Sequence, residues 1–366
     1  MRQSDVPYVT LALVPGIGRA RLEMLLAAFG SAEAALRAGQ KDLEKVPGIS
    51  LAAATAMKQA DISTGEKIGD RAERLGASVL VPTADKFPSM LREIPDAPTL
   101  LFALGRLDLL ESDSVSIVGS RSHTRYGAGA CRLLAGGTVR AGMVVVSGMA
   151  RGLDRVAHET ALEQGGGTVG VLGNGLGVVY PAANRALYER VANEGCLLSE
   201  YPPGEKPHAG SFPRRNRLIS GLSLVTVVVE ARERSGALIT ADCALTQGRE
   251  VLAVPGPITS PLSLGCNRLI QLGAKPALGP RDILEEFGRT VGDAPAASIS
   301  ANLTAAERDI LDILGLGIAQ VDEVATRAGH GVGETLAVLT SLEIRGLVTQ
   351  EPGKVFRLAF GTVANS

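Results

Sequence analysis

The feature that most limits the possible folds is a series of short apolar runs, rich in β-branched residues, between residues 77 and 287. Longer stretches with helical spacing separate successive runs. The runs read ASVLVP, TLLFAL, VSIVG, MVVVSG, TVGVLG, CLLSEY, LVTVVVEA and EVLAVPG. Continuous apolar strands that alternate with helices indicate a parallel sheet covered on both faces. The pattern therefore predicts an α/β domain with a doubly wound, Rossmann-like parallel sheet at residues 77–287.

Composition limits the class of protein and its partners. A chain of 366 residues is expected to form two or three domains. A net charge of −1 gives no overall attraction to nucleic acid, so such binding needs a local cluster of basic residues. The four cysteines form no C-x-x-C pair, and no segment reaches 18 uncharged apolar residues. We therefore expect a cytoplasmic protein without a membrane span, a disulfide framework or a zinc site.

The N-terminal part contains a repeated unit, VPGIGRARLEMLLAAFGS at 14–31 and VPGISLAAATAMKQA at 46–60. Each copy places a Pro-Gly hairpin before a helical pattern, which predicts a small helical domain at residues 1–70 of the helix-hairpin-helix or sterile-alpha-motif-like (SAM-like) type. Hairpin N–H groups of this kind can hold a DNA phosphate. Packing or protein contact is the favoured role, because short G-x-G hairpins are weak signals.

The C-terminal part predicts a second small domain after a linker. Residues 288–302 are small, polar and Pro-containing, as linkers are. Three helical patterns and a hairpin follow, which predicts a winged-helix-like domain at residues 303–366. Between 303 and 360 the chain carries five basic and eight acidic residues. This charge favours protein contact over DNA binding for the domain.

Glycine and arginine gather where the predicted strands end. Ligands of open α/β sheets bind outside the carboxyl ends of the strands, and folding should bring these strand exits to one rim. Arginines together with backbone N–H groups suit a polyanion. The arginines expected on this rim are Arg121, Arg125, Arg151, Arg185, Arg214, Arg215 and Arg217.

Two exits suggest how a nucleic acid would be held. GSRSHTRYG, residues 119–127, lacks both G-x-G-x-x-G and the P-loop pattern, yet it leads into a helix whose N-terminus would attract a phosphate. SFPRRNR, residues 211–217, places Phe212 beside three arginines and Asn216, so that a base could stack on the ring. The alternative for Phe212 is a place in the core.

Evidence for catalysis is weak. Asp154 and His158 share a helix face, and Ser147, Ser199 and Ser235 lie near strand exits. However, the sequence has no G-x-S-x-G elbow, no H-E-x-x-H and no acidic cluster. We predict no catalytic residues, no metal and no cofactor, with Asp154 as a helix cap or as the partner of an arginine.

Six segments together resemble the DNA processing protein A family, also called DprA or Smf, over residues 77–287. They are VSIVGSRSHTRYG, VVVSGMARGLDRVAHETAL, TVGVLGNGLGVVYP, SEYPPGEKPHAGSFPRRNRLISGLS, VVVEARERSGALITADCAL and REVLAVPGPITSPLSLGCNRLIQLGA. The resemblance implies a non-enzymatic recombination mediator that binds incoming single-stranded DNA (ssDNA), helps to load RecA during natural transformation and forms a homodimer. One departure is Gly177, where the family often has Asp.

The same resemblance implies the DNA-contacting residues. By motif position they are Gly119, Ser120, Arg121, Arg125, Ser147, Gly148, Arg151, Arg185, Phe212, Arg214, Arg215, Asn216 and Arg217. The alternative function is a nucleotide-processing enzyme of the phosphoribohydrolase or lysine-decarboxylase-like Rossmann class. The absence of a G-G-x-G-T signature counts against this enzyme.

Overall fold

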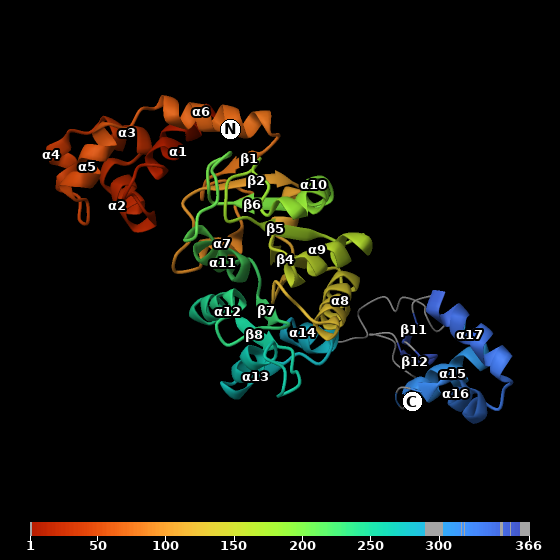
Figure 1. Ribbon diagram of the computed structural model, residues 1–366. Helices are drawn as coiled ribbons and strands as arrows, with labels where there is room; N and C mark the ends of the chain where they lie inside the picture. Colours follow the sequence, from red (N-terminus) through yellow and green to blue (C-terminus); the bar gives the residue numbers. More distant parts are fainter. Residues whose placement is uncertain are drawn as a thin grey trace. The chain divides into compact units, whose positions relative to one another are not determined.

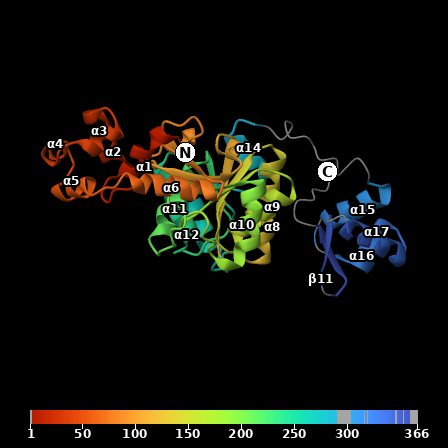
Figure 2. The same ribbon diagram turned by 90° about the horizontal axis from the view of Figure 1, so that it is seen from above.

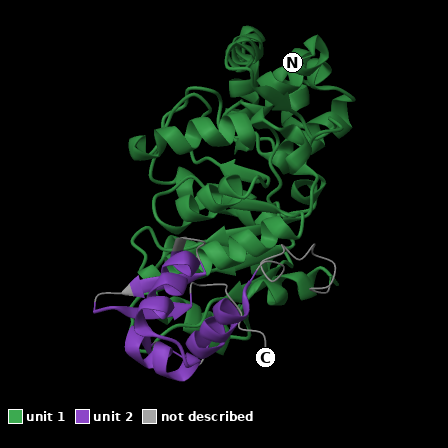
Figure 3. Ribbon diagram, turned by 90° about the vertical axis from the view of Figure 1, so that its right-hand side faces the viewer, with its two compact units in different colours: residues 1–293 green, residues 294–366 purple. Residues whose placement is uncertain are grey.

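The structure is a computed structural model that describes residues 2–289, 303–315, 317, 319–344, 347–351 and 353–358. It divides into two compact units, residues 1–293 and 294–366 (Figure 3). The predicted helical domain and the predicted sheet domain both lie in the first unit. The linker expected at 288–302 falls outside the described residues from 290 onward.

Unit 1 is built on a nine-stranded sheet with the order β1-β2-β6-β5-β4-β3-β7-β8-β9 (Figure 1). The strands are β1 Ser78–Leu80, β2 Leu101–Gly105, β3 Ser114–Val118, β4 Val144–Gly148, β5 Thr168–Val171, β6 Cys196–Ser199, β7 Val225–Val228, β8 Glu250–Ala253 and β9 Lys275–Pro276. From β6 to β9 all neighbours are parallel. The chain winds outward from β3 through β4 to β6, and then in the other direction from β7 to β9. The doubly wound sheet is therefore confirmed, and its direction of winding changes between β3 and β7.

The first two strands differ from the parallel arrangement that the sequence predicts. β1 pairs with β2, and β2 with β6, in antiparallel register. Only residues 106–113 separate β2 from β3, and they hold one short 3-10 helix, η2 Leu107–Leu110. A connection that carries the chain back into a parallel strand needs a dozen or more residues. The run TLLFAL therefore enters the sheet in the opposite direction.

Helices cover both faces of the sheet (Figure 2). One face carries α8 Arg125–Arg140, α9 Leu153–Glu163, α10 Arg185–Glu194 and α14 Pro280–Glu286; the other carries α7 Ser89–Arg92, α11 Ser211–Gly221, α12 Gly236–Thr246 and α13 Leu264–Gln271. Successive strand residues alternate between the two cores, so Val115 and Ile117 pack under α8 and α9 while Val118 packs on the α11 side. Burial on both faces explains why these strands are continuous apolar runs.

The N-terminal part of unit 1 is helical, as the sequence predicts. Its elements are η1 Gln3–Asp5, α1 Val6–Ala12, α2 Arg19–Phe29, α3 Ala32–Arg37, α4 Gln40–Glu44, α5 Leu51–Lys58 and α6 Ser63–Arg74. The two copies of the repeat fold alike, because Gly16 and Gly48 turn the chain at φ +82° and +78° before α2 and α5. Such positive φ values favour glycine. α6 then leads directly into β1.

Unit 2 is a winged helix, as the sequence predicts. Three helices, α15 Ala305–Gly315, α16 Val321–Ala328 and α17 Val332–Ile344, precede the hairpin of β11 Val348–Glu351 and β12 Val355–Leu358, and β10 Ala319–Gln320 completes a three-stranded antiparallel sheet. Ile310, Leu314, Val324, Leu339 and Phe356 form its core. The unit therefore has its own hydrophobic core.

The contact between α1 and α6 gives a test of the helical part. A Cβ at Gly65 would collide with Thr10 Oγ1 and lie 2.7 Å from the Val6 carbonyl oxygen. Alanine gains about 1 kcal/mol of helix propensity over glycine, but overpacking against backbone costs about 1–3 kcal/mol. We therefore expect Gly65→Ala to lower the free energy of unfolding, measured in urea. Gly236→Ala, which has open space around it, is the control and should change little. A Gly65→Ala variant as stable as the wild type would contradict this packing.

Candidate functional site

A cleft of about 590 Å³ opens where the direction of winding changes, between the ends of β3 and β7. Its walls are the loop after β3, the loop after β7, and the first turns of α11 and α12. The lining residues include Gly119, Ser120, Arg121, Asp154, Phe212, Arg215, Asn216, Arg232, Arg234 and Ser235. The cleft therefore lies where open α/β sheets bind their ligands.

The loop after β3 is held by hydrogen bonds of Ser120 and by the close packing of Gly119. The Ser120 hydroxyl donates to the carbonyl of Ser122 at 2.9 Å and accepts from the Ser122 N–H at 3.1 Å. The Ser120 carbonyl accepts from the N–H of Leu153 at 3.1 Å. A Cβ at Gly119 would collide with the Leu153 side chain. Gly119 and Ser120 thus shape the loop, and the Arg121 side chain is left exposed beside the cleft.

The N-terminus of α8 does not offer the free phosphate site that the sequence suggests. The buried carboxylate of Glu230, which follows β7, accepts from the Thr124 N–H at 3.0 Å and from its hydroxyl at 2.5 Å. Thr124 Oγ1 in turn accepts from the Gly127 N–H at 3.1 Å. The chain's own carboxylate therefore supplies the negative charge at this helix end. Sequence reasoning missed Glu230, although an acidic residue directly after a buried strand is a usable signal.

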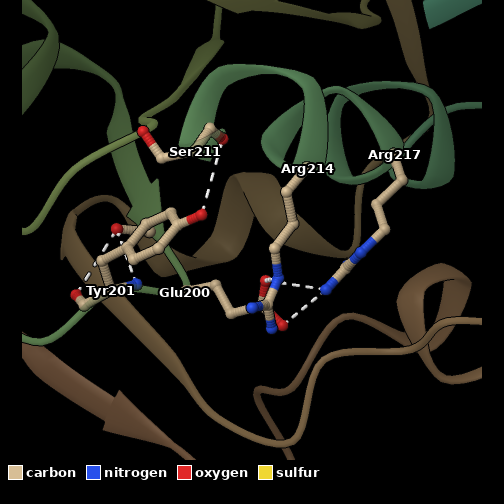
Figure 4. Close-up of polar contacts among 6 residues, drawn as sticks. Glu200, Tyr201, Ser211, Arg214 and Arg217 are labelled. Carbon is tan, nitrogen blue, oxygen red and sulfur yellow. Dashed lines mark hydrogen bonds and ion pairs between the residues drawn. The ribbon is translucent and has the colours of Figure 1, made fainter. Parts of the chain in front are cut away.

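The segment SFPRRNR is the start of helix α11 and not an extended turn, so its basic residues separate onto two faces. Phe212, Arg215 and Asn216 face the cleft. Arg214 and Arg217 point the other way, toward Glu200 (Figure 4). Arg217 Nη2 lies 2.5 and 2.7 Å from the two Glu200 carboxylate oxygens, and Arg214 Nε lies 3.4 Å from one of them. The structure therefore does not gather all the predicted arginines on one rim.

Arg215 is a buried residue of the cleft wall, with 6% of its surface exposed. Its guanidinium donates to the carbonyl of Val171 and, at 3.3 Å, to the Asn216 side chain. A Cβ at Gly148 would lie 2.6 Å from both the guanidinium and the Asp154 carboxylate, so only glycine leaves room for the two groups. Burial raises the pKa of Asp154 to about 6 although Arg215 opposes the shift, and burial lowers the pKa of Arg215. The predicted role of Asp154 as the partner of an arginine agrees with this arrangement.

Phe212 belongs to an aromatic pair at the edge of the cleft. Its ring centroid lies 5.3 Å from that of Tyr180, with the ring planes inclined at 35°. Both rings border a small cavity of about 60 Å³ next to Arg121, Arg151 and Arg215. Phe212 is half-buried and Tyr180 is 48% exposed, so Phe212 is not a core residue and the pair keeps aromatic surface at the cleft edge. Tyr180 was missed from the sequence.

The remaining predicted residues have different surroundings. Ser147 is buried and donates to the Ile117 carbonyl at 2.6 Å. Arg125 and Arg185 are exposed first residues of α8 and α10 and line neither the cleft nor the small cavity. Gly177 has φ +83°, a conformation that favours glycine. Whether any of these residues contacts DNA stays a prediction.

Two arginines of the cleft were not assigned from the sequence. Arg232 and Arg234 follow β7 in the segment EARERSG, and both are exposed at the cleft. The strand-exit argument covers this segment, but only parallel pairing of β3 with β7 brings it opposite Arg121. Together with Arg121 and Arg151, they are the exposed arginines that border the cleft and the small cavity.

His158, a candidate base, lies outside the cleft. It is fully buried, and burial lowers its pKa to about 4. Nε2 lies 2.9 Å from the Gly148 carbonyl and Nδ1 lies 2.7 Å from Thr168 Oγ1, so both ring nitrogens have partners. Within the described part of the chain, no three His, Cys, Asp or Glu side chains are placed to hold a metal ion. The described helices also include none long and apolar enough to span a membrane.

Known proteins match this chain in sequence. Protein Smf of Escherichia coli is 42% identical over 288 residues, which cover 76% of this chain and 77% of that protein. DNA processing protein DprA of Streptococcus pneumoniae is 47% identical over 203 residues, covering 56% of this chain and 72% of that protein.

Solved structures match it as well. The X-ray structure of DprA from S. pneumoniae aligns with a TM-score of 0.68 at 35% identity, over 78% of this chain and 98% of that one. DNA processing protein A from Helicobacter pylori, described for its single-stranded DNA binding mode, aligns with a TM-score of 0.52 at 30% identity, over 58% of this chain and 95% of that one.

Family models agree with these similarities. The model of DNA recombination-mediator protein A matches residues 78–288, and that of the DprA winged helix domain matches residues 294–354. The first match covers more than half of the chain and contains every strand and helix around the cleft. The chain therefore belongs to the DNA recombination-mediator protein A family, also called DprA or Smf.

Proposed function

We propose that the chain binds ssDNA in the cleft, protects incoming strands and helps to load RecA onto them during natural transformation. The observation that carries the binding step is the combination of exposed arginines with the Phe212–Tyr180 pair in one cleft. Guanidinium groups suit phosphates, and an aromatic ring suits an unpaired base. Bases are available for stacking only where a strand is single, so the pair favours ssDNA over a duplex.

Family membership supports the RecA contact and the homodimer, which both stay predictions. Exposed apolar side chains on α13 and around β9, namely Leu264, Leu272 and Leu278, provide a surface that a second copy could cover. The mechanism needs no chemical step in this chain. The cleft holds the sugar-phosphate backbone through arginines and loop N–H groups, and it presents a strand with little base preference.

Salt dependence tests the binding mode. Four exposed arginines, each neutralising one phosphate, give a slope near −3 for the logarithm of the ssDNA binding constant against that of the salt concentration, about 0.7 per contact. Arg121→Ala should flatten this slope by ~0.7. Phe212→Ala should lower the affinity at every salt concentration without changing the slope, because stacking displaces few ions. Arg121 is the better probe than Arg215, because Arg215 is buried and bonds the Val171 carbonyl, so its removal would also disturb the cleft wall.

The measurement is fluorescence anisotropy with labelled single-stranded and duplex oligonucleotides at several salt concentrations. Arg281→Ala is the matched control, because Arg281 is exposed on α14 and paired with Glu285 at 2.8 Å. A slope near zero, or equal affinity for single strand and duplex, would remove the basis for the cleft as the ssDNA site.

Unit 2 provides a second test. Removal of residues 290–366 should leave the affinity for ssDNA unchanged within about twofold, because unit 2 is more acidic than basic and repels phosphate. The same anisotropy titration measures this, with circular dichroism to verify that the remaining chain is folded. A tenfold loss of affinity in a folded truncated chain would show that the winged helix contributes to DNA binding.

The alternative, a nucleotide-processing enzyme, needs a general acid or base in the cleft. His158 is poorly placed for this role because its ring nitrogens already bond Gly148 and Thr168. We therefore propose a structural role for it and no catalysis. Nucleotides and nucleoside monophosphates incubated with the protein should stay unchanged, and turnover that disappears in His158→Gln would favour the enzyme.

The structural role of His158 predicts a pH dependence of stability. Its pKa is about 4 in the folded chain against 6.5 for an ordinary histidine. The unfolded chain takes up the proton first, so this contribution to stability is complete above pH 6.5 and is lost as the pH falls toward 4. The difference corresponds to about 3 kcal/mol. Urea unfolding at pH 7 and pH 4 should therefore show a larger loss of stability for the wild type than for His158→Gln. Equal losses of stability in the two proteins would contradict a lowered pKa of His158 in the folded chain.

A further inference from the structure

Unit 1 contains a second and larger cavity, of about 780 Å³, between its N-terminal helices and its sheet. One wall is the start of α2 with the VPGIG hairpin before it. The other wall is the outer face of α11 together with Glu200 and the segment around Asp96. We call it the arginine groove, because four arginines line it: Arg19, Arg21, Arg214 and Arg217.

The charges in the arginine groove leave an excess of one positive charge, since three carboxylates, Glu23, Asp96 and Glu200, also line it. Arg19 is paired with Glu23 at 2.7 Å. Glu200 is shared by Arg214 and Arg217, and the Arg214 side chain is still 61% exposed. Arg21 donates to the Gly16 carbonyl at 2.5 Å, and none of the described carboxylates forms an ion pair with it. Arg21 and Arg214 can therefore accept a further anionic partner.

The hairpin adds backbone donors to the same wall. α2 begins at Arg19 after Gly18, which has no side chain to cap the helix. Among the described residues, the N–H groups of Arg19, Ala20 and Arg21 find no acceptor. In the second copy of the repeat, Ser50 Oγ accepts from the Ala53 N–H at 3.2 Å and caps α5. Free N–H groups at a helix start favour an anion, so they reinforce the arginines of the groove.

The arginine groove adjoins the cleft at Pro213 of α11, which lines both cavities. Of the arginines that follow Pro213 in the helix, Arg215 faces the cleft, whereas Arg214 and Arg217 face the groove. A strand that leaves the cleft over Pro213 therefore meets Arg214 next. An acidic protein segment could pair with the same arginines. The position of the groove beside the cleft instead favours a DNA strand that already occupies the cleft.

We infer that the arginine groove is a second phosphate-binding site for the same DNA strand, so that ssDNA runs from the cleft over Pro213 onto the N-terminal helices. This inference rests on the proposed function of the cleft. It assigns DNA contact to the helix-hairpin repeat, for which packing alone was the favoured role from the sequence. The contacts are made to phosphates, so the extension is independent of base sequence.

The length of the DNA tests this inference. Fluorescence anisotropy would compare oligothymidylates of about 6 and about 20 nucleotides, lengths below and above the upper site size of a compact single-strand binder. In the full chain, the double variant Arg21→Ala/Arg214→Ala should bind the long oligonucleotide roughly tenfold more weakly, the effect of losing charge-assisted phosphate contacts. Its affinity for the short oligonucleotide should match the wild type. Arg37→Ala, exposed on α3 and paired with Glu33 at 2.7 Å, is the control.

Single variants show whether a weaker binding comes from lost DNA contacts or from a hairpin distorted by the loss of Arg21. Arg214→Ala leaves the hairpin intact and should still weaken binding of the long oligonucleotide only. Arg121→Ala, in the cleft, should weaken binding of both lengths. If the cleft variant behaves so and the groove variants bind the long oligonucleotide like the wild type, the groove inference is wrong and the groove is left to an acidic protein segment. Equal losses at both lengths would also overturn it. If Arg121→Ala changes neither length, the cleft proposal itself fails.

Discussion

The buried pair of Arg215 and Asp154 joins the elements that form the cleft. Arg215 extends from α11 to the carbonyl of Val171 at the end of β5, and it lies against Gly148 at the end of β4. Asp154, in the first turn of α9, supplies the opposite charge. Loss of a buried group that is hydrogen-bonded in this way typically costs about 1–3 kcal/mol. The position of α11, and with it that of Phe212, depends on this pair.

Burial distinguishes the arginine that maintains the structure of the site from the arginines that are accessible to a ligand. Arg215 is buried and committed to protein partners, whereas Arg121, Arg232 and Arg234 are exposed at the cleft. Glu230 neutralises the start of α8, which removes the usual place for a nucleotide phosphate. The cleft is therefore open and carries several separate arginine side chains, with the Phe212–Tyr180 pair at its edge. Such a surface suits repeated contacts along a strand better than enclosure of one small molecule.

Helix α11 gives the two cavities of unit 1 a common wall. In a helix, residues three apart lie on the same face and consecutive residues do not. Arg214 and Arg217 therefore line the arginine groove, whereas Arg215 lines the cleft. Glu200 forms ion pairs with both Arg214 and Arg217 (Figure 4). Unit 2 has its own core and its acidic charge, so its contribution is expected to be to protein contacts.

Much of the fold could be predicted from the sequence, because it depends on local patterns. Nearly continuous apolar runs such as LVTVVVEA are typical of strands buried on both faces, and the two VPGI hairpins need glycine at a positive φ. Gly119 and Arg121 could likewise be placed at a strand exit. The antiparallel direction of β2 was missed, since it depends on the short connection to β3 and on which edge is free.

The composition of the site was decided by tertiary structure. Strand order alone brings Arg232 and Arg234 opposite Arg121, because β3 and β7 are neighbours despite more than a hundred intervening residues. The helical state of residues 211–221 divides SFPRRNR between two surfaces, which a linear reading groups together. Glu230 and Tyr180 gained their roles from partners distant in the chain. The sequence by itself thus determined the residue types at each strand exit, because local backbone geometry selects them, whereas burial and pairing across the sheet determined which of them remain free to bind.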